Sequence, residues 1–108
     1  MELSEYQRRS RSTAAYPREV AITYPALGLA GEAGEVADHI KKVFRDDAGV
    51  VADDRRERIA DELGDVLWYV AQLATELELD LEQIAARNLE KLASRARRGV
   101  IAGSGDKR

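Results

Sequence analysis

The 108-residue chain contains no cysteine, two prolines, one phenylalanine and a single histidine. Without cysteine it can form neither a disulfide nor a thiolate nucleophile, and cysteine-type zinc sites are excluded with them. His39 alone cannot supply the two Glu-x-x-His pairs of a ferritin-like di-iron site, and the zinc hydrolase motifs fail for the same reason. We expect His39 to be polar helix surface and the protein, which has no disulfide, to be cytoplasmic.

Long apolar runs and excess positive charge are also missing. No segment reaches the roughly 20 apolar residues that a membrane span needs, so no membrane association is expected. The first five residues, Met-Glu-Leu-Ser-Glu, lack the basic and apolar regions of a signal peptide, so none is expected. The net charge of −3 gives no electrostatic case for binding nucleic acid.

The chain is rich in residues that favour helices, and its apolar residues recur with a helical period. We predict four helices, over about residues 4–12, 25–45, 54–77 and 80–98. Three pairs have capping-box spacing: Ser4 and Gln7, Asp54 and Glu57, Asp80 and Gln83. In the second helix one apolar stripe comprises Ala26, Leu29, Ala30, Ala33, Ala37, Ile40 and Phe44, and in the third Ile59, Leu63, Val66, Leu67, Val70, Ala74 and Leu77.

Short connections between such helices predict an all-α fold, an antiparallel four-helix bundle. Residues 1–98 would form one helical domain, closed by Gly99, and residues 99–108 a glycine-containing basic tail.

A short motif occurs twice, thirty residues apart. Ala-Gly-Glu-Ala-Gly-Glu-Val at residues 30–36 aligns with Ala-Asp-Glu-Leu-Gly-Asp-Val at residues 60–66. Each copy places two acids at the edge of its apolar stripe, so two antiparallel helices would bring Glu32, Glu35, Glu62 and Asp65 around one point. Clustered negative charges are unfavourable unless a cation binds them, and ligands that are all oxygen select hard cations. We therefore predict a Mg²⁺ site, in which Mn²⁺ could substitute.

Glycines and cations accompany this predicted site. Gly28, Gly31 and Gly34 each cost about 1 kcal/mol relative to alanine in a helix, and we attribute them to space needed near the carboxylates, the alternative being close helix packing. On the last predicted helix Asn88, Lys91 and Arg95 share one edge and suit the oxygens of a polyphosphate. Lys107 and Arg108, in the tail, could fold over the same phosphates.

Three segments carry a resemblance to a known family. The segments from Leu27 to Val36, Glu62 to Tyr69 and Asn88 to Leu92 resemble the MazG-like nucleoside triphosphate pyrophosphohydrolases of the all-α pyrophosphatase group. The family signature ExxE…ExxD falls on Glu32, Glu35, Glu62 and Asp65. One departure is Gly31, where many members carry a further acid.

The resemblance implies Mg²⁺-dependent hydrolysis of a standard or modified nucleoside triphosphate to a monophosphate and pyrophosphate, in nucleotide-pool housekeeping. It also implies assembly as a homodimer or homotetramer. Glu35, or Glu32, would accept the proton of the attacking water, while Lys42 would join the phosphate-binding residues. Side chains suited to stacking or hydrogen bonding with a base are Gln7, Tyr16, Tyr24, Trp68 and Tyr69.

Other functions fit the same residues. The chain could be a non-enzymatic helical interaction module whose acids merely form its solvent-exposed face. Within the same fold it could be a dUTPase-like or a phosphoribosyl-ATP-specific hydrolase.

Overall fold

The computed structural model describes residues 1–99, and all regular structure in this part of the chain is helical. The elements are α1 (Leu3–Ser10), a 3-10 turn (Arg11–Thr13), a second 3-10 turn (Arg18–Val20), α2 (Thr23–Asp46), α3 (Asp53–Glu76) and α4 (Leu81–Arg98). The all-α prediction is confirmed. None of the described helices is long and apolar enough to cross a membrane.

The predicted helix ends are correct at α4 and differ at α1 and α3. The Asp80 carboxylate accepts a 2.9 Å hydrogen bond from the backbone N–H of Glu82, and Gly99 closes α4 at a φ of 73°. Neither α1 nor α3 has a side-chain cap, because each begins earlier than predicted, after Glu2 and Ala52. Ser4 and Asp54 therefore lie inside the first turn.

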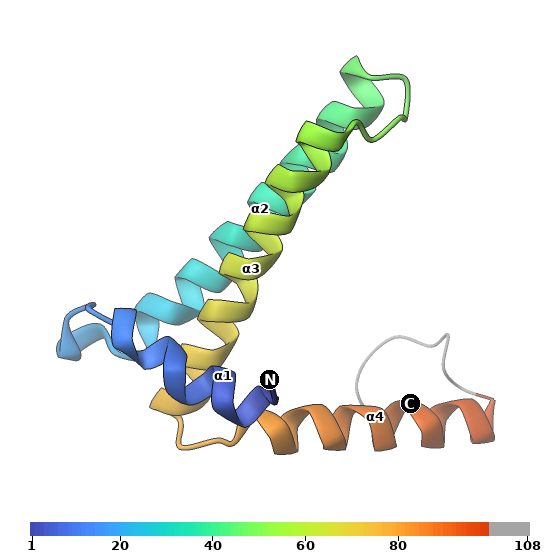
Figure 1. The fold of residues 1–108 in the computed structure, drawn as a ribbon. Helices are drawn as coiled ribbons and strands as arrows, with labels where there is room; N and C mark the ends of the chain where they lie inside the picture. The colour runs from blue at the N-terminus through green and yellow to red at the C-terminus, as the bar shows by residue number, and fades with distance from the viewer. Residues whose placement is uncertain (100–108) are drawn as a thin grey trace.

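The two longest helices, α2 and α3, form an antiparallel hairpin (Figure 1). In the tight turn between them Ala48 and Gly49 have φ angles of 55° and 79°. The N–H groups of Asp47 and Gly49 both donate to the carbonyl of Val43, which closes α2. Each helix has 24 residues and is about 36 Å long.

The residues that α2 and α3 turn toward each other recur at spacings of three and four. All are buried or half-buried: Leu29, Glu32, Val36, His39 and Val43 on α2, and Arg55, Ile59, Glu62, Val66 and Tyr69 on α3. Acids and a histidine thus occupy positions in the helix interface that apolar residues normally fill. Near the turn Arg55 lies 3.0 Å from Nδ1 of His39, so His39 is half-buried between helices rather than plain helix surface.

The helices α1 and α4 lie at the other end of the hairpin. The short α1 packs across α3 and against the start of α4. Its Gln7 amide donates to Thr75 Oγ1 (3.0 Å) and to the Leu79 carbonyl (2.9 Å), and its oxygen accepts from the Leu81 N–H (2.8 Å). Gln7 therefore fixes the turn between α3 and α4.

Beyond this turn α4 extends away from the hairpin (Figure 1). The radius of gyration is 16.6 Å, whereas a compact domain of this length has about 13 Å. One chain alone does not complete the predicted four-helix bundle, because its described helices form a hairpin, a short crossing helix and a projecting helix. An apolar stripe predicts that a helix packs against another element, but it does not indicate whether that element belongs to the same chain.

One side of the hairpin is apolar and exposed, and we call it the apolar face. It consists of Ala33, Ala37, Ile40 and Phe44 on α2 and Leu63 and Leu67 on α3. These positions each follow a facing residue by one, which is about 100° of rotation, and in antiparallel helices that rotation leads to the same side. Phe44 is 72% exposed and Leu63 53%. Much of the predicted apolar stripe therefore lies on this surface instead of in a core.

Candidate metal centre and base pocket

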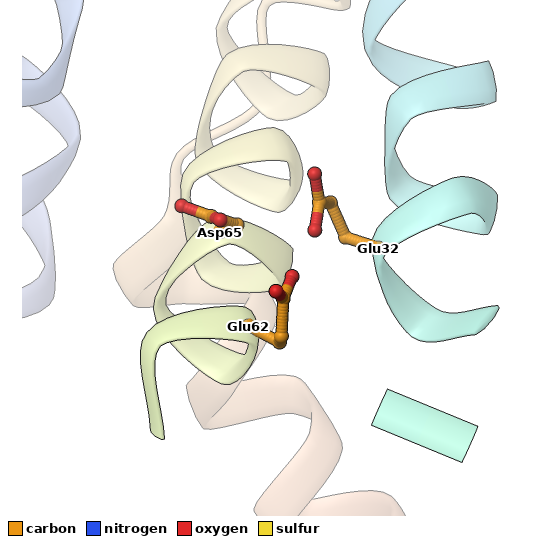
Figure 2. A group of neighbouring side chains, drawn as sticks. All are labelled: Glu32, Glu62 and Asp65. Carbon is orange, nitrogen blue, oxygen red and sulfur yellow. The ribbon is translucent and has the colours of Figure 1, made fainter. Parts of the chain in front are cut away.

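Three of the four predicted carboxylates meet at the middle of the hairpin. One oxygen from each of Glu32, Glu62 and Asp65 lies within 4.8 Å of the others. Glu32 and Glu62 approach each other across the interface, and Asp65 extends from α3 toward the side of α1 (Figure 2). The cluster arises because the duplicated motif places one acid of each copy on the facing row of its helix.

Holding these acids close together is electrostatically unfavourable, and the pKa of Glu32 shows this. The pKa of Glu32 is raised to about 7, first by its hydrogen bond to Glu62, then by burial and by the charges of Glu62, Asp65 and Glu35. Without a cation, the Glu32 carboxyl therefore keeps its proton up to about neutral pH.

The donor set suits a hard divalent cation. All donors are carboxylate oxygens, and oxygens on opposite sides of a Mg²⁺ ion are about 4.2 Å apart, within the spread of this cluster. Two of the three residues are half-buried and Asp65 is exposed, which leaves positions for water or substrate oxygens.

Glu35 lies outside this group. It is exposed and sits one turn further along α2, near enough for its charge to contribute to the raised pKa of Glu32. The fourth predicted ligand is therefore beside the cluster and is not one of its converging oxygens.

The glycines of α2 divide into two kinds. A Cβ on Gly28 would lie 2.2 Å from the Tyr69 ring, so this glycine makes room for an aromatic side chain. A Cβ on Gly31 or Gly34 would meet nothing within 4 Å. Close packing therefore explains Gly28, while the space beside Gly31 and Gly34 is open.

An aromatic pocket of about 270 Å³ includes Tyr69, which lies one helical turn beyond Asp65 on α3. Its residues are Thr13, Ala15, Tyr16, Pro17, Tyr24, Trp68 and Tyr69. The Tyr16 and Tyr24 rings stack at 5.2 Å, and Trp68 stands edge-on to Tyr69 at 5.1 Å. The structure thus brings together Tyr16, Tyr24, Trp68 and Tyr69, all of which the sequence singled out. Gln7 is not among the lining residues, because both ends of its amide bond the α3–α4 turn.

The predicted phosphate-binding cations are not beside the acids in one chain. Lys42 is paired at 2.8 Å with Asp38 of its own helix. Asn88 and Lys91 line a surface depression on α4, which projects away from the hairpin, and Arg95 of the same helix is buried. Lys107 and Arg108 lie outside the described residues.

Sequence reasoning missed a polar cluster on the last turns of α3. Gln72 is fully buried and Glu76 nearly so, and both bind residues of the segment before α2. The available signal was the continuation of the acidic row, since Asp65, Tyr69, Gln72 and Glu76 follow one another at spacings of three and four.

The raised pKa of Glu32 predicts a pH-dependent effect of metal on stability. The folded chain keeps a proton that the unfolded chain loses near pH 4.5, so metal-free stability from this group should fall between about pH 4.5 and about pH 7. Mg²⁺ relieves the repulsion, and should therefore raise Tm more at about pH 8 than at about pH 5.5. Calorimetry with EDTA or Mg²⁺ measures this difference. Glu32→Gln should remove it, and an equal Mg²⁺ effect at both pH values in the wild type would contradict the assignment.

The described residues thus form a helical hairpin that carries three converging carboxylates and an aromatic pocket, which places the chain in the class of all-helical proteins with a candidate metal centre. The comparisons with known proteins make this class specific. The model of the MazG nucleotide pyrophosphohydrolase domain matches residues 23–100, and the chain belongs to this family.

One relative is similar to this protein over the whole chain. The Gene 37 protein of Mycobacterium phage L5 is 46% identical over 114 aligned positions, which cover all of both chains. No solved structure matches the chain.

Proposed function

We propose that this protein is a Mg²⁺-dependent nucleoside triphosphate pyrophosphohydrolase, which releases a nucleoside monophosphate and pyrophosphate. The observation that carries the proposal is the convergence of Glu32, Glu62 and Asp65 beside an aromatic pocket, in a chain of the MazG family. The acids would hold the metal and the rings of Tyr24, Trp68 and Tyr69 would receive the base. We place the activity in the cytoplasm, in housekeeping of the nucleotide pool.

The proposed reaction is attack of water on the α-phosphorus. Bound Mg²⁺, which Mn²⁺ could replace, would neutralise phosphate oxygens and favour deprotonation of water. Glu35, exposed one turn from the cluster, would accept the proton of the water, with Glu32 as the alternative acceptor. The new bond joins the water oxygen to the α-phosphorus, the bond from that phosphorus to the bridging oxygen breaks, and pyrophosphate leaves.

We further propose that the active form contains at least two chains. The apolar face is too exposed to be a favourable surface for a lone chain in water. Pairing with the apolar face of a second copy would complete a four-helix arrangement from two hairpins. Because α4 carries Asn88, Lys91 and Arg95 away from the acids of its own chain, we propose that they bind phosphates at the site of a neighbouring copy, Arg95 after leaving its buried position. Lys42, after leaving Asp38, and the tail residues Lys107 and Arg108 would complete neutralisation.

The product test separates this reaction from an ordinary phosphatase. We expect a panel of ribo-, deoxyribo- and modified nucleoside triphosphates, with dUTP and phosphoribosyl-ATP included, to yield only monophosphate and pyrophosphate. In water enriched in heavy oxygen, mass spectrometry should find the label in the monophosphate, since the α-phosphorus is attacked. The same reaction with EDTA is the control. A diphosphate and orthophosphate as products would refute the proposal, and no turnover of any compound would favour a non-enzymatic interaction module.

A further inference from the structure

The carboxylate of Glu76 is the centre of a partly buried polar cluster that joins α3 to the segment before α2. Its side chain is 9% exposed. It accepts hydrogen bonds from Arg11 (2.9 Å), from Arg18 through both oxygens (2.7 and 3.0 Å) and from the Tyr16 hydroxyl. We call these four residues the Glu76 clamp.

A second layer of hydrogen bonds supports the clamp. The same Arg11 nitrogen also donates to the Tyr16 hydroxyl (2.9 Å) and to Gln72 Oε1 (3.0 Å). The Gln72 amide in turn donates to Ser10 Oγ at 2.7 Å. Polar atoms buried at this depth are costly unless bonded, so the network favours one arrangement of the segment over others.

Charge makes this arrangement durable over the usual pH range. The pKa of Glu76 is lowered to about 2 by hydrogen bonds from Arg18, Tyr16 and Arg11, so it stays ionised. The pKa of Tyr16 is raised, chiefly by burial and also by its bond to Glu76, so its hydroxyl remains a donor. The Arg18 guanidinium lies 5.2 Å from the centre of the Tyr16 ring and holds it from a further side.

The consequence reaches the aromatic pocket through Tyr16. With its hydroxyl held by the clamp, this side chain presents its ring to the pocket, stacked on Tyr24 at an interplanar angle of 14° and edge-on to Trp68 at 6.5 Å. The indole N–H of Trp68 is also engaged, since it donates to Thr13 Oγ1 at 2.9 Å and to the Ser10 carbonyl. The hydroxyl contacts that hold the Tyr16 ring in place are thus made with residues outside the pocket.

We propose that Glu76 is a positioning residue which, through Tyr16, sets the shape of the base pocket and so controls how tightly a nucleotide base is bound. This inference rests on the proposed nucleotide hydrolase function. Glu76 lies eleven residues, or about 16 Å along α3, from Asp65. Its effect therefore falls on binding of the base and not on the chemical step at the acids.

The test compares Glu76→Gln with Glu78→Gln, which removes the same charge from an exposed position two residues further on. For the best substrate of the wild type, we expect Glu76→Gln to raise KM about tenfold and to change kcat by less than about twofold. Glu78→Gln should behave as the wild type. An unchanged KM, or a fall in kcat without a change in KM, would overturn the inference.

A binding measurement tests the same inference without turnover. The chain has one tryptophan, Trp68, and it lines the pocket, so its fluorescence reports directly on occupancy. Titration with the nucleoside monophosphate in EDTA should give a Kd about tenfold higher for Glu76→Gln than for wild type and Glu78→Gln. Equal Kd values would overturn the inference even if the proposed hydrolysis were confirmed. If the wild type bound the nucleotide but hydrolysed none, a higher Kd for Glu76→Gln would still support the inference, and only the proposed function would be refuted.

A milder variant keeps the test valid should Glu76→Gln fail to fold. Tyr16→Phe retains the ring and removes only the hydroxyl that the clamp holds. It should raise Kd and KM severalfold with kcat preserved, and circular dichroism should show unchanged helix content. Wild-type values in a folded Tyr16→Phe protein would contradict the role of the clamp.

Discussion

Glu62→Gln and Asp65→Asn should each lower kcat/KM for nucleoside triphosphate hydrolysis by at least about a thousandfold. The two side chains belong to the three whose oxygens lie within 4.8 Å of one another. Each substitution keeps the size of the side chain and removes a charge that a divalent cation needs. Rates at saturating Mg²⁺, together with Mg²⁺ affinity from calorimetry, would measure the loss.

The matched control for these variants is Asp61→Asn. Asp61 is an exposed acid on the same turn of α3 and does not belong to the cluster. It should retain wild-type activity and Mg²⁺ affinity, and all three variants should keep their helix content. Normal hydrolysis by Glu62→Gln or Asp65→Asn would show that the acids are only a solvated helix surface.

The second large effect concerns assembly. Changing both Phe44 and Leu63 to Glu should raise the dimer dissociation constant by at least about a thousandfold. Both copies carry both substitutions, so a symmetric interface would have to bury four negative charges. Sedimentation over a range of concentrations would measure this change. Val50→Glu is the control, since Val50 is 66% exposed and lies in the turn, outside the apolar face.

Activity gives a second measurement of the same variant. If Asn88 and Lys91 bind phosphates at the site of another copy, the separated chains should lose hydrolysis together with association. A double variant that remains dimeric would refute the apolar face as the interface. A monomeric variant with full activity would instead show that one chain holds a complete site.

The features predicted correctly from the sequence are those that depend on residues close together along the chain. The helical class, the Asp80 cap, Gly99 and the pairing of Glu32 with Glu62 all follow from short spacings and a motif repeated after thirty residues. The same local reasoning was limited where partners are distant. Periodicity did not reveal that much of each stripe is exposed, and it could not distinguish the role of Gln7 in the α3–α4 turn from one in the pocket.

The Glu76 clamp was unpredictable for a related reason. Its partners, Arg11, Tyr16 and Arg18, come from about sixty residues earlier in the chain. The helical spacing that continues the row from Asp65 places Glu76 on the same side of α3, but in a sequence with 34% charged residues it does not identify these distant partners. Only the fold of the segment before α2 brings these groups together.

The position of the acids within one hairpin has a consequence for how the protein forms. Glu32 and Glu62 meet once α2 and α3 close on a tight turn, a contact between segments near each other in the chain and therefore fast to form. Docking of α1 and projection of α4 are not needed for that meeting. During synthesis these acids would thus be assembled while the last helix is still emerging, and the cation that we propose they bind would stabilise the hairpin before any second copy is available.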